Sequence, residues 1–209
     1  MLPALCIALA TRLATDGVAK VDSVLPAALA ADVRAVALAA AVPSAQRQEV
    51  PLSLKSDAVA SAAAAVALSP VGAALEELCG DAPLFDLCAV VSAPGCASQP
   101  LHSDLGFDGA VAAPLYTCFV ALQATPSALG PTEFCVGSHT DAAAHHVLRG
   151  GGDLDAVPFP LAVGAAVLFD PRIAHRGGPN SSNRRRAYLS MTFANPRGSA
   201  PVIVPAPGD

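Results

Sequence analysis

Residues 164–194 read GAAVLFDPRIAHRGGPNSSNRRRAYLSMTFA, and this stretch decides the fold. An apolar run, Gly164–Phe169, ends at the turn-forming residues Asp170-Pro171-Arg172. Residues 177–183 consist almost wholly of turn formers, so the chain folds back there. From Arg186 onward polar and apolar residues alternate, which is the period of a strand with two different faces. The stretch therefore predicts strands joined by turns.

The rest of the chain after residue 80 also consists of short strand-like runs separated by turn-forming residues. Short runs rich in Val, Leu, Phe, Tyr and Thr are bounded by Pro, Gly, Asn and Asp, as in strands. The region from Thr140 to Pro160 is polar and rich in glycine, and we expect a surface loop there. The predicted strands are Leu84–Ser92, Leu115–Gln123, Pro131–Val136, Gly164–Phe169 and Arg185–Ala194.

The first eighty residues are different, because Ala and Leu dominate and Pro, Gly and Ser mark the joints. Helices followed by strands predict an α+β protein with a mainly β core of the jelly-roll type. We expect one domain over 1–209, with a helical layer over 1–80 and the β core over 81–209. The predicted helices are Leu2–Ala14, Pro26–Val42, Asp57–Leu68 and Val71–Cys79, with a short strand at Val18–Asp22.

The composition argues against nucleic-acid binding and against a membrane-spanning protein. The formal net charge of -5 offers no basic surface for nucleic acid. The longest apolar run, Ala58–Leu68, is too short to span a membrane, so a cytoplasmic protein is expected. Hydrophobic residues make up 53% of the chain, but aromatic residues only 4%, and there is no Trp. We therefore expect a core of small side chains and pocket walls of mostly Ala, Val and Leu. The six cysteines form no Cys-x-x-Cys pair, which favours buried free thiols.

Three residues are candidates for a metal site. In His102-Ser103-Asp104, the first and third side chains share one face of a strand. His175 follows the apolar strand that ends at Phe169, and an antiparallel barrel could bring it next to this pair. Two imidazoles and one carboxylate would hold one face of a metal and leave the other open, which suits Fe(II) oxygen chemistry. Zinc catalysis tolerates the same ligands.

Arg186 is the candidate for binding an anion. It shares one strand face with Tyr188, Ser190 and Thr192, and an arginine on an inward face fits a carboxylate partner. Arg184 and Arg185 are neighbours that a change of register would exchange with it. A dicarboxylate co-substrate fits this arrangement.

Together these residues resemble the phytanoyl-CoA dioxygenase family of Fe(II)- and 2-oxoglutarate-dependent oxygenases. The resemblance covers most of the chain, including Asp16-Gly17-Val18 near its start. The motifs that carry it are His102-Ser103-Asp104, Gly130-Pro131-Thr132-Glu133-Phe134, Gly137-Ser138-His139, and His175 with Gly178, Asn180 and Arg186.

The resemblance implies a double-stranded β-helix in which His102, Asp104 and His175 hold iron and Arg186 pairs with 2-oxoglutarate. It implies hydroxylation of a small organic or acyl substrate by dioxygen, with decarboxylation of 2-oxoglutarate to succinate. The metal aspartate is present, which favours hydroxylation over halogenation. A jelly-roll protein of the same ancestry that only binds a ligand, or holds a different metal, is the alternative.

One departure from the family pattern concerns co-substrate binding. Many relatives carry a small hydroxyl residue two positions after the second metal histidine, where this chain has Gly177. Tyr188 is the candidate replacement, because it lies two residues after Arg186 on the same strand face.

Four further residues have plainer interpretations. We expect His139 to be a loop residue near the rim of the site, and His145 and His146 to be a solvated pair. We expect Glu133 to be a hydrogen-bonded structural carboxylate.

Overall fold

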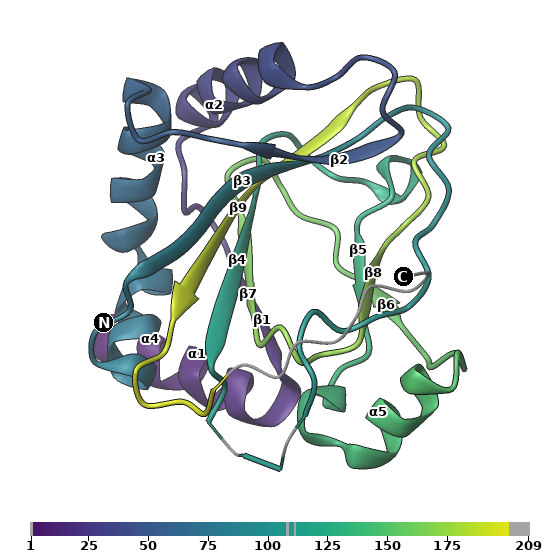
Figure 1. Ribbon diagram of the computed structural model, residues 1–209. Coiled ribbons are helices and arrows are strands. Elements are labelled where there is room, and N and C mark those ends of the chain that lie inside the picture. The colour runs from purple at the N-terminus through teal and green to yellow at the C-terminus, as the bar shows by residue number, and fades with distance from the viewer. Residues whose placement is uncertain (1, 108, 111, 201–209) are drawn as a thin grey trace.

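The computed structural model of the chain describes residues 2–107, 109–110 and 112–200. A large antiparallel sheet forms its centre and a smaller one lies opposite (Figure 1). The strand order is β1-β7-β4-β9-β3-β2 in the large sheet and β6-β5-β8 in the small one. The strands are β1 (Val18–Val21), β2 (Arg47–Pro51), β3 (Leu84–Ser92), β4 (Leu115–Ala121), β5 (Thr132–Phe134), β6 (Val157–Pro158), β7 (Ala166–Phe169), β8 (His175–Gly177) and β9 (Arg186–Ala194).

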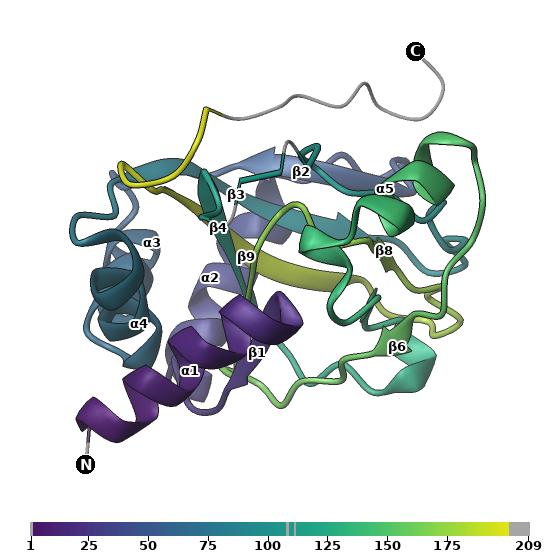
Figure 2. The same ribbon diagram turned by 90° about the horizontal axis from the view of Figure 1, so that it is seen from below.

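Four helices cover the outer face of the large sheet, as Figures 1 and 2 show from two sides. Small apolar side chains, mostly Ala, Val and Leu, fill the space between helices and sheet. This confirms the predicted N-terminal helical layer. Residues 1–80 also contain β1 and β2, which belong to the large sheet. The helices are α1 (Leu2–Asp16), α2 (Ala27–Ala40), α3 (Asp57–Ala67) and α4 (Pro70–Cys79).

Helix α4 illustrates how the local sequence sets an element. Ser69 caps its start, since its hydroxyl accepts a hydrogen bond from the amide of Val71, and Pro70 occupies the first turn. The helix ends at Gly80, whose φ of 74° is a conformation that other residues rarely adopt.

Strand β9 lies in the middle of the large sheet and confirms the predicted alternation. Leu189 and Met191 point toward the helical layer, whereas Tyr188 packs between the two sheets. The second core contains Phe134 from β5 and Phe169 from β7. The sheets therefore enclose a space of their own, as in a jelly roll.

The expectation of a loop from Thr140 to Pro160 is wrong. Helix α5 (Ala142–Arg149) and strand β6 lie within it, and two short 3-10 helices, Ser127–Leu129 and Ser138–Thr140, come before α5. Asp141 starts α5 by accepting a hydrogen bond from the amide of Ala143 at 2.8 Å. The sequence does not indicate this helix, because it has only eight residues and three glycines follow it.

Within the described residues, no single helix has the length and hydropathy to cross a membrane. Helices α3 and α4 reach that threshold only when taken together, and they are bent by 62°. Cys79, Cys88, Cys96, Cys118 and Cys135 are free and buried, as expected.

Candidate functional site

Three predicted side chains meet between the two sheets. The Nε2 atoms of His102 and His175 each lie 3.7 Å from Oδ1 of Asp104. One ligand atom from each residue can be chosen so that all lie within 4.8 Å of one another. His175 is almost fully buried, while the Asp104 side chain is 44% exposed. The geometry can hold one metal ion with an open side toward solvent.

Backbone pairing brings these residues together from distant parts of the sequence. His102 and His175 form an antiparallel bridge, with N···O distances of 3.0 and 2.7 Å. The amide of Asp104 donates to the carbonyl of Pro171 at 2.9 Å. The loop carrying His102 and Asp104 is thus fixed against the segment that leads into β8.

Both imidazoles are oriented by backbone carbonyls. Nδ1 of His102 lies 3.0 Å from the carbonyl oxygen of Pro100, and Nδ1 of His175 lies 3.0 Å from that of Ile173. When Nδ1–H donates there, Nε2 is left with its lone pair toward Asp104. Burial, followed by the nearby His175, lowers the pKa of His102 and favours the neutral ring that a metal needs.

A buried ion pair stabilises the turn before His175. Arg172 donates to the carboxylate of Asp170 through Nε and Nη2, the latter at 2.6 Å, and both side chains are almost completely buried. Another guanidinium nitrogen donates to the carbonyl of Ala110 at 2.7 Å. The sequence predicted the turn, but it did not predict the buried ion pair between Asp170 and Arg172 within it.

Arg186 points into the same space from β9. Its guanidinium donates to the hydroxyl of Ser92 at 2.9 Å and to the carbonyl of Gly130, and it lies over the ring of Tyr188. Burial lowers the pKa of Arg186, but a guanidinium stays charged at neutral pH. Nε of Arg186 and the hydroxyl of Tyr188 are buried and have no hydrogen-bond partner in the described residues. Both residues line the cavity, where a ligand would supply the missing partners.

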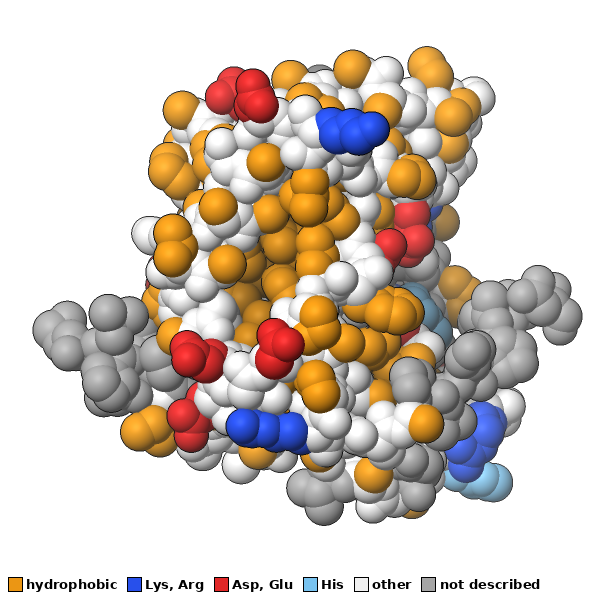
Figure 3. Space-filling model, turned by 60° about the vertical axis from the view of Figure 1, so that its left-hand side comes forward, with side chains coloured by type: hydrophobic (Ala, Val, Ile, Leu, Met, Phe, Trp, Pro, Cys, Tyr) orange, Lys and Arg blue, Asp and Glu red, His pale blue; other side chains and the backbone are white. Residues whose placement is uncertain are grey.

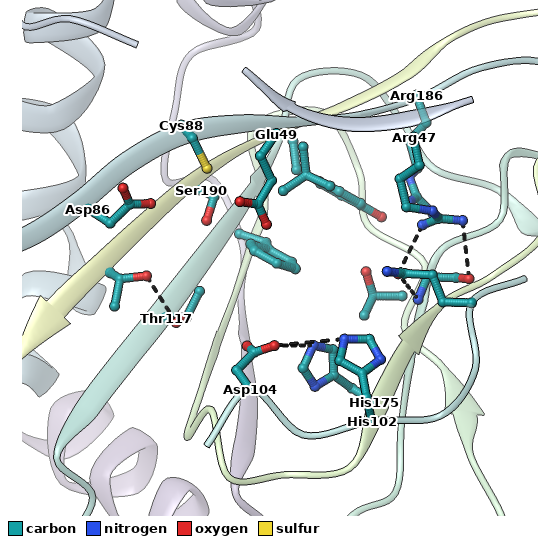
Figure 4. Close-up of a pocket in the computed structure, with 17 residues that line it drawn as sticks. Arg47, Glu49, Asp86, Cys88, His102, Asp104, Thr117, His175, Arg186 and Ser190 are labelled. Atoms are coloured by element: carbon teal, nitrogen blue, oxygen red, sulfur yellow. Dashed lines mark hydrogen bonds and ion pairs between the residues drawn. The ribbon is translucent and has the colours of Figure 1, made fainter. Parts of the chain in front are cut away.

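A cavity of about 150 Å³ joins these groups, and its walls are polar. The expectation of Ala, Val and Leu walls is wrong, because the small apolar residues pack against the helices instead. Figure 4 shows Arg47 and Arg186 at one end of the cavity, Asp86 at the other, and Asp104 beside the histidines. The lining residues are Arg47, Glu49, Asp86, Cys88, Val90, Gln99, His102, Asp104, Thr117, Phe119, Thr132, His175, Gly177, Arg186, Tyr188, Ser190 and Thr192.

The family model of phytanoyl-CoA dioxygenase (PhyH) matches residues 13–188 of the chain. The chain belongs to the phytanoyl-CoA dioxygenase family. It is therefore a member of the iron- and 2-oxoglutarate-dependent oxygenase superfamily, as the motifs predicted. No curated protein matches the chain significantly.

Solved structures share the phytanoyl-CoA dioxygenase fold. The epimerase SnoN, in complex with Fe3+, alpha ketoglutarate and nogalamycin RO, is 24% identical with a TM-score of 0.71, covering 99% of this chain and 93% of its own. The non-heme alpha ketoglutarate dependent carbocyclase SnoK is 16% identical with a TM-score of 0.70, covering 94% and 87%. HygX from Streptomyces hygroscopicus, with nickel, 2-oxoglutarate and hygromycin B bound, is 12% identical with a TM-score of 0.71, covering 95% and 96%. At these identities the likeness concerns the fold.

The departure from the family pattern at Gly177 has a physical cause. A Cβ atom at this position would overlap the guanidinium of Arg47. That guanidinium donates to the side-chain oxygen of Gln99 at 3.1 Å and to the carbonyl of Ala97 at 3.0 Å. The same Gln99 oxygen accepts from the Gly177 amide at 2.9 Å. Arg47, which no sequence pattern singled out, thus occupies the space of the missing side chain.

The other predicted residues of this family member fall outside the cavity. His139 is 2% exposed beneath α1, with Nε2 3.3 Å from the carbonyl of Ala14, so its placement at the rim is wrong. His145 is 3% exposed, so only His146 of the expected solvated pair is solvated. Glu133 accepts from Arg176 at 2.7 Å, which confirms a structural carboxylate.

The three consecutive arginines are also separated by the structure. Arg185 donates to the carbonyl of Pro43 at the surface, and only Arg186 of the three lines the cavity. The predicted register is therefore confirmed.

Proposed function

We propose that this protein is a dioxygenase that uses Fe(II), 2-oxoglutarate and dioxygen to hydroxylate a small organic or acyl substrate. His102, Asp104 and His175 are assigned as metal ligands. Arg186 is assigned to the distal carboxylate of 2-oxoglutarate and Tyr188 to a supporting hydrogen bond. The observation that carries the proposal is the triad at one wall of a cavity whose end is formed by a buried arginine.

The residues fit an iron ion by their chemistry. Two neutral imidazoles and one carboxylate form the facial ligand set that leaves room for a co-substrate and dioxygen. The carbonyl partners of both Nδ1 atoms fix the ring orientation before any metal binds. The bound iron supplies the oxidising chemistry, coupled to decarboxylation of 2-oxoglutarate to succinate.

The protein's own contribution is orientation. A guanidinium binds a carboxylate through two parallel hydrogen bonds, and Arg186 is held for this by Ser92 and Gly130. The buried hydroxyl of Tyr188 lacks a partner, and a carboxylate oxygen would provide one. The co-substrate would thus bind at the end of the cavity formed by Arg186 and Tyr188, opposite Asp86.

Anaerobic titration with Fe(II) and 2-oxoglutarate tests the proposal, because their chelate on the protein has a visible charge-transfer band. We expect a saturable band with the whole chain. A folded protein without the band would overturn the proposal and leave a binding protein, or one with another metal. Because SnoN is an epimerase and SnoK a carbocyclase, product analysis must then identify hydroxylation.

A further inference from the structure

The cavity beside the triad has opposite charges at its two ends. Along β3, Asp86 pairs with Thr192 of β9, whereas Ser92 pairs with Arg186 on one side and Arg47 on the other. Asp86 and Ser92 are six positions apart, which is about 20 Å of strand. Figure 4 shows this arrangement, with Glu49 directed into the cavity between the two ends. A ligand spanning the cavity therefore meets cations at one end and carboxylates at the other.

The acidic end is only partly compensated within the site. A divalent metal with Asp104, Arg186, Arg47 and a dicarboxylate carries one positive charge overall, so Glu49 and Asp86 together leave one uncompensated negative charge. In the described part of the chain, neither of them forms an ion pair. A cation at this end would relieve the repulsion between these carboxylates.

The hydroxyl of Tyr188, assigned above to 2-oxoglutarate, indicates that the cavity takes polar ligands. This hydroxyl has no partner, the side chain is 1% exposed, and it lines the same cavity. The strand register places Tyr188 beside Val90, which pairs with Glu49. A buried polar atom without a partner is costly until a ligand supplies one. The cavity is therefore suited to a polar ligand that passes Tyr188.

A separate apolar hollow adjoins the acidic end at Asp86. It measures about 530 Å³ and shares Asp86 with the cavity, and Phe85 is 68% exposed on its wall. Figure 3 shows hydrophobic side chains gathered in a hollow on this face. Its lining residues are Leu52, Ser53, Leu54, Lys55, Leu84, Phe85, Asp86 and Leu87. The inner cavity of about 150 Å³ is small for a co-substrate plus a whole drug-sized molecule, so part of the substrate must lie outside it.

From these features we infer that the substrate is an amphiphilic amine. Its ammonium group lies at Glu49 and Asp86, and its apolar part extends past Asp86 over Phe85. The inference rests on the proposed function, because the cavity is the one assigned to 2-oxoglutarate. It names the substrate class of that site.

The first test compares three probes of one size: hexylamine, hexan-1-ol and hexanoate. Their affinity is measured by calorimetry on the whole chain, both metal-free and with Fe(II) and 2-oxoglutarate without oxygen. The carboxylates are accessible to water, which limits what each contributes. In both states we expect hexylamine to bind about tenfold more tightly than hexan-1-ol. With 2-oxoglutarate occupying Arg186, hexanoate should bind most weakly. Equal affinities for amine and alcohol would overturn the inference.

The second test uses variants. Glu49→Gln with Asp86→Asn should abolish the preference for the amine. Asp32→Asn with Glu77→Gln removes the same charge from exposed helix positions and should preserve it. Phe85→Ala, at an exposed position, should reduce the gain in affinity from propylamine to hexylamine. A preference that survives in the first variant would contradict the inference, and so would an unchanged gain in the Phe85 variant.

Failure of this inference is distinguishable from failure of the proposed function. The Fe(II)–2-oxoglutarate band is recorded on the same samples without any amine. A band without amine preference would remove only the substrate class. Amine preference without a band would keep the cation-binding site at Glu49 and Asp86 and remove the oxygenase.

Discussion

Gly177 leaves room for the guanidinium of Arg47, which lies where a side chain at position 177 would begin. The two residues come from different sheets, β8 and β2, and both contact the side-chain oxygen of Gln99. The glycine and the arginine are thus coupled, because a side chain at position 177 requires the Arg47 guanidinium to move.

Gly177→Ser should therefore destabilise the protein by about 1 kcal/mol, because the flexible end of Arg47 must leave its hydrogen bonds to Gln99 and Ala97. Adding it to Arg47→Ala should cost little beyond Arg47→Ala alone, because the overlapping group and its hydrogen bonds are then already gone. Urea denaturation of the two single variants and the double variant measures the coupling between the positions. Additive effects would show that the overlap does not determine the cost.

Arg186→Ala should weaken 2-oxoglutarate binding by about 30-fold or more, since it removes one member of a buried charge pair. Fe(II) binding should change little, because the triad is separate from the guanidinium. The adjacent Arg185→Ala is the matched control, as Arg185 points to the surface. Anaerobic titration of the band compares them, and equal weakening by both variants would refute the assignment of Arg186.

Asp170→Asn should cost about 3–5 kcal/mol in the free energy of unfolding, because Arg172 loses its carboxylate in a buried environment. Glu133→Gln breaks the more exposed pair with Arg176 and should cost about 1 kcal/mol or less. Urea denaturation measures both. We also expect weaker metal binding in the first variant, since the turn before His175 loosens. A similar loss of unfolding free energy in both variants would contradict the claim that burial makes the Asp170–Arg172 pair the costlier one to break.

The free energy of unfolding should fall as the pH drops below about 6.5. Burial lowers the pKa values of His139 and His145, so the unfolded chain binds more protons than the folded chain in this range. Each histidine contributes up to ~1.4 kcal/mol per pH unit, and nothing above its ordinary pKa. His145→Gln should make the slope shallower, whereas His146→Gln, at an exposed position, should not. Denaturation of metal-free protein between pH 5 and 7.5 compares the slopes; equal slopes in both variants would contradict the prediction.

The sequence was sufficient where a periodic pattern was long. Strand β3 has the predicted bounds, and the alternation in β9 placed Arg186 and Tyr188 on the inner face. The histidine pair and Asp104 also meet as expected, although His102-Ser103-Asp104 lies in a loop with one bridge to His175 and not in a strand as predicted. Their chemical roles, the division into one domain and the compartment stay predictions.

Short elements could not be found in the same way. Strand β8 has three residues and β2 has five, of which only Val50 is buried, so neither offers a period. Arg47 and Glu49 were missed with β2. Asp86 could have been predicted as a cavity residue, because it lies on the same face as Cys88 and Val90 in a strand that the sequence predicted. The polar cavity followed from pairing between strands, which a single pattern does not contain.

Strand β2 is the last strand of the large sheet and pairs only with β3. It carries Arg47 and Glu49 two residues apart on the face turned to the cavity. Because side chains repeat every second residue, sliding β2 by two positions would put one charge near the former place of the other without reversing the strand's faces. Two of the charged side chains of the cavity thus belong to a peripheral strand, whose inward charges can be exchanged without altering the central strands of the sheet.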